Sequence, residues 1–197
     1  FSSRYGEGAV EAFFSPGRVN LIGEHTDYNG GFVFPCALTF GTYCLVRFND
    51  RKSFRFASVN MDFETEIALD APILPLEKVW VNYPLGVIAQ FIKRGLLFDK
   101  GADLLFYGNV PNGAGLSSSA ALEVVTAVAI DALYGFGFER VELVKMAQKA
   151  EHEFAGVMCG IMDQFASGMG KKNHAIFLNC DTLDFELVPV VLDGYKI

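Results

Sequence analysis

The feature that most constrains this chain is a run of small and aliphatic residues at 119–134. Its apolar residues do not form one stripe but continue nearly all the way round a helix, interrupted by Glu123, Thr126 and Asp131. A helix of this kind is stable when other elements surround it. Its uninterrupted apolar runs are too short to span a membrane. The chain must therefore build a core around this helix.

The surrounding segments predict a sheet and further helices. Early segments alternate in period two or carry apolar and aromatic runs without helical spacing, whereas later ones repeat every three to four residues. The expected strands lie at 9–15, 32–48, 53–67 and 102–110, with a strand-like run at 187–192, and the expected helices lie at 79–91, 119–134 and 140–154. With no internal repeat or linker, we expect one α+β domain.

The composition excludes several classes of partner. The chain has 197 residues, of which 51% are hydrophobic, and 16 Lys+Arg against 23 Asp+Glu give a net charge of -7. We expect no nucleic-acid or membrane partner, because a polyanion would be repelled. The four cysteines have neither a CxxC pair nor metal-ligand spacing with the three histidines, which favours a reduced, cytoplasmic protein. Because the chain starts at Phe1 and stops at Ile197 just after a strand-like run, we expect both ends to be cut.

Residues 17–31 form the first candidate site. Arg18, Glu24, His25 and Asp27 lie within a short segment bracketed by glycines and apolar residues. Carboxylates and an imidazole beside flexible backbone suit a small polyhydroxyl molecule, whose hydroxyls need donors and acceptors at fixed places. A capped turn with its charges in water explains the same pattern equally well.

Residues 111–122 form a candidate phosphate loop between an expected strand and an expected helix. Gly113, Ala114, Gly115 and Leu116 lead into three serines, Ser117, Ser118 and Ser119. Backbone N–H groups and the positive end of a helix would converge there on an anion. The string is neither GxxxxGK[ST] nor a complete GxGxxG, so a plain connecting turn is the competing interpretation.

Two acids follow this loop. Glu151 lies on the apolar face of the helix at 140–154, whereas Glu153 points away. A buried carboxylate needs a partner, either a Lys or Arg at the edge of the core or a metal ion. Asp163 stands alone in an apolar stretch, either as a chemical group or as the N-cap of a short helix at 164–167.

Two aromatic residues, Trp80 and Tyr83, lie one helical turn apart. Their pattern by itself favours core packing.

The quoted motifs together resemble those of a known family. Residues 16–31 resemble the galactokinase signature, and nearly every position fits. The string at 111–122 is similar to the second conserved motif of the GHMP kinases, which include galactokinase, homoserine kinase, mevalonate kinase and phosphomevalonate kinase. The run Ala-Glu-His-x-Phe-Ala-Gly at 150–156 also matches the galactokinase pattern. The chain is identified on these motifs, over residues 14–191, as a member of this family.

The resemblance implies galactose and ATP as substrates, with Mg²⁺. Asp163 would take the proton from the anomeric hydroxyl, and Arg18 beside it would compensate charge. The loop would hold the ATP phosphates, and Ser117 and Ser118 would donate to phosphate oxygens. The remaining implied roles are sugar contacts for Glu24, His25, Asp27 and Gly160, Mg²⁺ ligation for Ser119 and Glu151, and an adenine pocket for Trp80 and Tyr83.

The resemblance also implies a fold and a boundary. Residues 1–197 would be the N-terminal lobe of the two-lobed GHMP kinase fold, similar to domain 2 of ribosomal protein S5, with helices packed on a mixed sheet. The C-terminal lobe, with a third glycine-rich motif and a tyrosine of the galactose pocket, would be absent, and the isolated lobe would turn over very slowly. The function implied is phosphorylation of α-D-galactose to galactose 1-phosphate in cytoplasmic galactose catabolism.

Two alternatives remain at this stage. An N-acetylgalactosamine kinase would differ in the room around the second carbon of the sugar. A catalytically silent sensor of galactose and ATP is disfavoured because Ser117 to Ala121 are intact.

Overall fold

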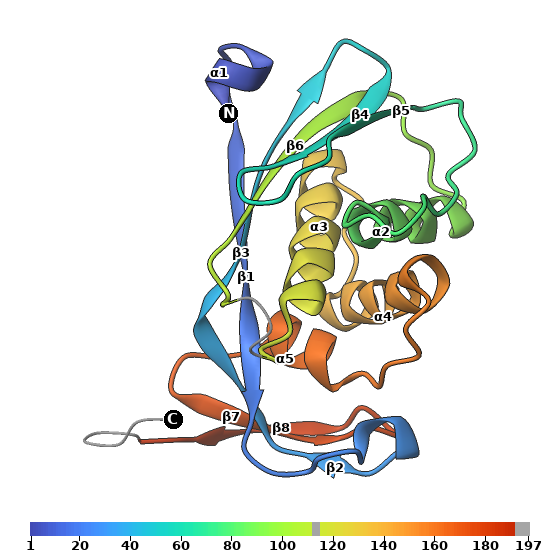
Figure 1. The fold of residues 1–197 in the computed structure, drawn as a ribbon. Coiled ribbons are helices and arrows are strands. Elements are labelled where there is room, and N and C mark those ends of the chain that lie inside the picture. The colour runs from blue at the N-terminus through green and yellow to red at the C-terminus, as the bar shows by residue number, and fades with distance from the viewer. Residues whose placement is uncertain (112–114, 192–197) are drawn as a thin grey trace.

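A computed structural model describes residues 1–111 and 115–191, which build a mixed β-sheet with helices packed on it (Figure 1). The strands are β1 (Glu11–Asn20), β2 (Phe32–Val33), β3 (Pro35–Asn49), β4 (Ser53–Ser58), β5 (Thr65–Ala68), β6 (Gly101–Gly108), β7 (His174–Asn179) and β8 (Phe185–Pro189). They follow the order β2-β7-β3-β6-β4-β5, with β1 paired to β3 and β8 paired to β7. β4 and β6 run parallel, whereas β1, β3 and β6 pair antiparallel. The expected α+β class and mixed sheet are confirmed.

The helices lie mainly on one face of this sheet (Figure 1). They are α1 (Ser2–Tyr5), α2 (Asn82–Lys93), α3 (Ser118–Tyr134), α4 (Arg140–Ala150) and α5 (Met162–Met169), with a 3₁₀ turn at Asp27–Asn29 and a π-helical turn at Glu151–Ala155. In the parts of the chain described here, no helix is both long and apolar enough to cross a membrane.

The two faces of the sheet differ because side chains alternate along each strand. Cys44 of β3 and Phe106 of β6 are opposite each other and fully buried against the helices. The next residues, Tyr43 and Tyr107, are also paired, but point to the other face and are about half exposed. Phe14 of β1 extends this exposed row, with its ring centroid 4.7 Å from that of Tyr43. One face of the sheet therefore carries the core, and the other carries open aromatic side chains.

The central helix is α3, as its apolar composition predicts. Residues along most of its length are buried, and it contacts the sheet as well as α2, α4 and α5. The neighbouring α2 begins at Asn82, so Pro84 falls in its first turn, where a missing N–H costs no helical hydrogen bond. The expected helices at 79–91 and 119–134 are confirmed with small shifts in their ends.

The expected helix at 140–154 changes character at residue 151. The α-helix ends at Ala150 and continues as the π-helical turn, closed by Gly156 at a φ of 72°. Such turns insert an extra residue and are common at functional sites. Glu151 is buried and Glu153 is exposed, as predicted from their spacing.

Several elements had no prediction. The short α1 and the strand β7 were missed, because neither has a clear periodic pattern. The strand-like run at 187–192 corresponds to β8, which lies at Phe185–Pro189 and pairs with β7. With β2, these strands form the lower part of the sheet in Figure 1, and a second apolar cluster packs between them and α5.

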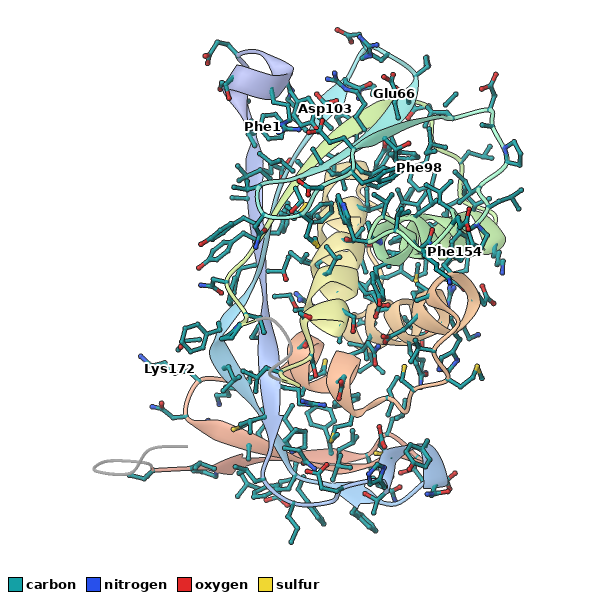
Figure 2. The ribbon with its side chains drawn as sticks, in the orientation of Figure 1. Phe1, Glu66, Phe98, Asp103, Phe154 and Lys172 are labelled. Atoms are coloured by element: carbon teal, nitrogen blue, oxygen red, sulfur yellow. The ribbon has the colours of Figure 1, made fainter. Side chains whose placement is uncertain are left out.

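A buried ion cluster lies at the opposite end of the sheet. Asp103 is fully buried at the start of β6 and pairs with Nε of Arg55 at 2.7 Å and Nε of Arg47 at 3.3 Å. Asn49 donates to the same carboxylate at 2.7 Å. Figure 2 shows Asp103 near Phe1, whose ring lies under the guanidinium of Arg47. The cluster joins three strands and attaches the N-terminal segment to them.

Candidate functional site

Asp163, the second residue of α5, lies at the centre of the candidate site. Its Oδ1 accepts from Nε of Arg18 at 2.8 Å and lies 2.7 Å from Nη2 of the same guanidinium. Its Oδ2 accepts from the Ser117 hydroxyl at 2.6 Å. The N-cap position belongs to Ile161 and no side chain caps α5, so the interpretation of Asp163 as an N-cap is wrong. The acid instead joins β1, α5 and the candidate phosphate loop.

Arg18 also holds that loop against β1. Its backbone N–H donates to the carbonyl of Leu116 at 3.2 Å, and its Nη1 donates to the carbonyl of Gly115 at 2.7 Å. Gly17 permits this approach, because a Cβ there would lie 2.5 Å from the carbonyl oxygen of Leu116. Gly113 and Ala114 lie outside the described residues.

The loop borders an open hollow of about 300 Å³. α3 begins at its edge, so an anion in the hollow would meet the N-terminal end of a 17-residue helix. Ser117 already donates to Asp163, whereas Ser118 is exposed and Ser119 is half-buried. The described lining residues are Arg18, Val110, Pro111, Gly115, Leu116, Ser117, Ser118, Ser119 and Asp163.

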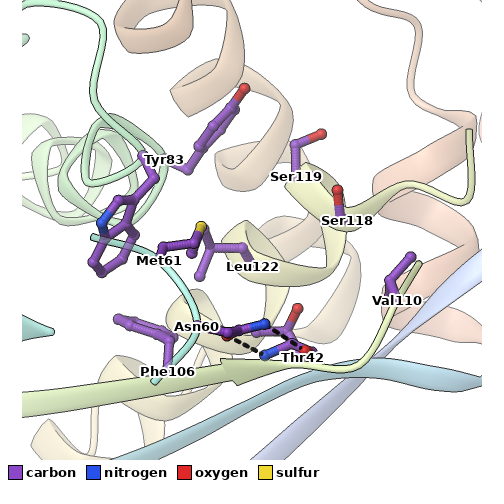
Figure 3. Close-up of a pocket in the computed structure, with 11 residues that line it drawn as sticks. Thr42, Asn60, Met61, Tyr83, Phe106, Val110, Ser118, Ser119 and Leu122 are labelled. Carbon is purple, nitrogen blue, oxygen red and sulfur yellow. Dashed lines mark hydrogen bonds between the residues drawn. The ribbon is translucent and has the colours of Figure 1, made fainter. Parts of the chain in front are cut away.

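A second pocket continues from this hollow and shares Val110, Ser118 and Ser119 with it. It is narrower, about 170 Å³, and more apolar. Figure 3 shows Tyr83 and Ser119 on the helical side of the pocket and Phe106 with Asn60 on the strand side. Asn60 is held by two hydrogen bonds to the backbone of Gly108, at 2.7 and 3.2 Å. A flat apolar group beside a phosphate site would fit such a pocket.

Trp80 and Tyr83 both line this second pocket. The Trp80 indole N–H donates to the carbonyls of Asp62 and Phe63 at 2.9 and 3.0 Å, and its ring packs edge-on against Phe106. Both aromatic residues also pack against the core. Each of them can therefore contribute to the core and to the pocket wall at the same time.

Asp27 and Gly160 come from distant segments and lie in direct contact. A Cβ at residue 160 would overlap the Asp27 carboxylate, so glycine is required for this approach. Both residues line a third hollow with Tyr28 and Cys159. The structure therefore brings together two of the predicted sugar contacts.

Glu24 and His25 are exposed in this structure, as expected for the alternative of a turn in water. Glu24 accepts from Asn20 Nδ2 at 2.8 Å, and His25 Nδ1 lies 2.8 Å from the Tyr28 hydroxyl. The segment thus divides into a half-buried part at Asp27 and an exposed part at 24 and 25.

Glu151 is buried behind the phosphate loop without a basic partner. No ion pair in residues 1–111 and 115–191 includes it, so the alternative of a salt bridge to Lys or Arg is wrong within that range. Its Oε2 accepts from Gln164 Nε2 at 2.6 Å and from the Cys159 thiol at 3.2 Å. The exposed Glu153 is the residue that pairs with Lys93, which lowers the pKa of Glu153.

Glu123 was missed as a candidate. It lies one turn after Ser119 on α3, is fully buried, and accepts from Gln164 at 3.0 Å. Desolvation, with the neighbouring charge of Glu151, raises the pKa of Glu123 well above its usual value. A carboxylate in the first turns of a helix that is apolar nearly all the way round was the signal that could have identified it.

The residues behind the loop fit a hard divalent cation. Glu151 is a buried carboxylate that lacks a cationic partner among the described residues, and Ser119 offers a hydroxyl at the shared edge of two pockets. Mg²⁺ typically takes one or two protein oxygens and completes its shell with phosphates and water. The donor set suits that ion.

Comparisons with known proteins identify the family of the chain. The sequence profile of the GHMP kinases N-terminal domain matches residues 82–171, and the galactokinase galactose-binding signature matches residues 1–48. A galactokinase of Fusobacterium nucleatum is 58% identical over 194 residues, which are 96% of this chain. The chain belongs to the GHMP kinase family. The family and the fold predicted from the motifs are confirmed.

Solved structures place this GHMP kinase chain in the same fold. The Lactococcus lactis galactokinase complexed with galactose matches 98% of the chain with a TM-score of 0.93 and 45% identity. The Methanococcus jannaschii mevalonate kinase matches 96% of it with a TM-score of 0.74 and 16% identity, which shows the shared fold alone. The chain spans about half the length of the relatives: 49% of the Fusobacterium galactokinase, 51% of the Bacillus subtilis one and 50% of the Lactococcus chain.

Proposed function

We propose that the protein phosphorylates α-D-galactose at its anomeric hydroxyl, with ATP as donor, to give galactose 1-phosphate. One observation carries the proposal: Asp163, ion-paired to Arg18, lies at the wall of a hollow that also receives the N-terminus of α3. An acid placed beside an anion site is what transfer of a phosphoryl group to a hydroxyl requires. The galactose-binding signature over residues 1–48 supports a sugar as the acceptor.

Asp163 would accept the proton of the sugar hydroxyl. A carboxylate offers about four lone-pair sites. Two contacts from Arg18 and one from Ser117 occupy three of them, which leaves one on Oδ2 for a substrate hydroxyl. Arg18 would hold the carboxylate in place and compensate negative charge that develops between donor and acceptor.

The loop and its neighbours would hold the nucleotide. Ser118 and the backbone at the start of α3 would bind phosphate oxygens, and Trp80 with Tyr83 would line the space for adenine. Ser119 and Glu151 would hold Mg²⁺, which neutralises phosphate charge when bound. Asp27 and Gly160 would contact the sugar, with Glu24 and His25 closing over it from their exposed positions.

An assay of ADP release by the full-length protein, with galactose, N-acetylgalactosamine or no sugar, tests the proposal. Preferential turnover of galactose is the expected result. Preference for N-acetylgalactosamine would make the protein a kinase of that sugar. Calorimetric binding of galactose and ATP without turnover would make it a sensor, and no binding of either would refute the proposal.

We further propose that a second lobe, of the length that the relatives have beyond the matched part, docks on the open aromatic face of the sheet. The face carries Phe14, Tyr43 and Tyr107, and the relatives are about twice as long as this chain. Exposed apolar patches of this kind mark docking surfaces. Residues 1–197 alone should self-associate in light scattering and release ADP far more slowly than the full-length protein. Comparable turnover would show that a second lobe is dispensable.

A further inference from the structure

Two buried carboxylates behind the candidate site share a single amide group. Gln164 Nε2 donates to Glu123 Oε2 at 3.0 Å and to Glu151 Oε2 at 2.6 Å. Glu123 and Gln164 are 0% exposed and Glu151 is 6% exposed. The ion pairs of residues 1–111 and 115–191 include neither acid. The amide of Gln164 must turn its NH₂ group toward the two acids, because the reverse orientation would place its oxygen against both carboxylates.

Two oxygen atoms of this cluster lack a hydrogen-bond donor among the described residues. Both N–H groups of Gln164 are used, but among the described residues its own Oε1 has no donor, and neither does Oε1 of Glu123. A buried polar atom without a partner destabilises the folded state. A proton on Glu123 Oε1 would make that atom a donor, and Gln164 Oε1 is an acceptor that lacks one.

We propose that Glu123 and Gln164 form a buried acid–amide pair that positions the carboxylate of Glu151. Glu123 meets Glu151 through Gln164 in the described hydrogen bonds, so it acts as a positioning residue and not as a ligand. The inference rests on the proposed function, in which Glu151 holds Mg²⁺. The raised pKa of Glu123 agrees with a neutral acid, and the other ionisable groups that face the pair are Asp163, Tyr83 and Cys159.

The pair would matter because of where Glu151 sits. It begins the π-helical turn and its Oε2 is anchored by Gln164 and by the Cys159 thiol. Its Oε1 has no partner among the described residues and remains available to a cation. Groups that orient a ligand without touching the metal are commonly worth about 10–100-fold in metal affinity.

Binding of Mn²⁺ as a substitute for Mg²⁺ tests this directly. The full-length protein with a non-hydrolysable ATP analogue is titrated with Mn²⁺. The loss of the free-ion electron paramagnetic resonance signal, corrected by a titration of the analogue without protein, gives the dissociation constant. Glu123→Leu, which fills the space without hydrogen bonds, should weaken Mn²⁺ binding by about 10-fold. Glu123→Gln should bind as the wild type does, because a second amide can still donate to and accept from Gln164. Glu153→Gln, which removes an exposed carboxylate on the same turn, serves as the matched control.

The outcomes separate the possible roles. Equal Mn²⁺ affinity in Glu123→Leu and the wild type would overturn the proposal, even if the melting temperature falls. Equal losses in Glu123→Leu and Glu123→Gln would overturn it in favour of a charged ligand. If Glu123→Leu does not fold, Gln164→Met replaces it, with the same 10-fold expectation. Galactose phosphorylation by the wild type is measured with ATP on separate portions of the same preparation, so failure of the proposed function would appear there independently of the ranking of variants.

Discussion

Asp103 and Glu123 are both completely buried, but their surroundings are opposite. Asp103 meets two guanidinium groups and an amide, so its charge is compensated by residues of the sheet itself. Glu123 lies beside Glu151 and Asp163, and Arg18 pairs with the last of these. The difference indicates two uses of buried acid. The Asp103 cluster compensates a buried charge within the fold, whereas Glu123 and Glu151 lie close together with no ion pair among the described residues.

The largest expected effect is a loss of turnover when Asp163 is replaced. Asp163→Ala should lower galactose phosphorylation by at least about 100-fold, because a positioned general base contributes about 10²–10⁴-fold. Stability should change little, since the side chain is partly exposed. Turnover and thermal unfolding measured on one preparation give both quantities. A variant that keeps more than roughly a tenth of wild-type turnover would exclude a general-base role.

The reverse result is expected at Asp103. Asp103→Ala leaves Arg47 and Arg55 without a counter-charge, which for buried pairs costs about 3–5 kcal/mol in the free energy of unfolding. We expect about 3 kcal/mol, because these side chains remain 16% and 20% exposed. Urea denaturation of the variant and of Asp103→Asn measures it. Turnover per folded molecule should stay at the wild-type value. A loss of turnover without a loss of stability would contradict a purely structural role for Asp103.

A smaller and ligand-specific effect is expected at the sugar hollow. Asp27→Ala should weaken galactose binding by about 10-fold or more, because hydrogen bonds to a charged group contribute about 1.5–3 kcal/mol. ATP affinity should stay unchanged, because Asp27 lines a different hollow from the phosphate loop. Calorimetric titration with each ligand distinguishes the two. Equal losses for both ligands would argue for a folding defect near Gly160 instead of a sugar contact.

A pH dependence of stability, with no effect of Glu123→Gln on turnover or ligand binding at a fixed pH, is expected at Glu123. Its pKa is raised in the folded state by desolvation and by the charge of Glu151, so above the unfolded pKa the folded state holds a proton that the unfolded chain has lost. Stability from this group therefore falls as pH rises, by about 1.4 kcal/mol per pH unit until the folded pKa is reached. Glu123→Gln removes this slope.

Urea denaturation at pH 5 and pH 7 compares the variant with the wild type. The free energy of unfolding of Glu123→Gln, relative to that of the wild type, should increase as the pH rises. Asp163 and Glu151 are present in both proteins, so their titration contributes equally to first order. Curves that remain parallel across this range would mean that Glu123 is ionised in the folded protein.

Much of the fold could be predicted from local patterns. The all-round apolar run at 119–134 predicts the central helix because such a helix needs neighbours on every side. The spacing of Glu151 predicts its burial because helical periodicity determines which side of a helix faces the core. The short α1 and the strand β7 lack such periodicity, and their formation depends on the partners they find.

The sequence by itself determined most of the strands, the helices α2, α3 and α4 and the inward position of Glu151, because these depend on neighbours within a few turns. Only the tertiary structure decided that Arg18 meets Asp163, 145 residues away, and that Glu123 meets Gln164, 41 residues away. It likewise decided that Asp103 gathers two arginines from adjacent strands. The physical reason is that periodicity assigns a side chain to a face, whereas the pairing of strands and packing of helices determine which charges share that face.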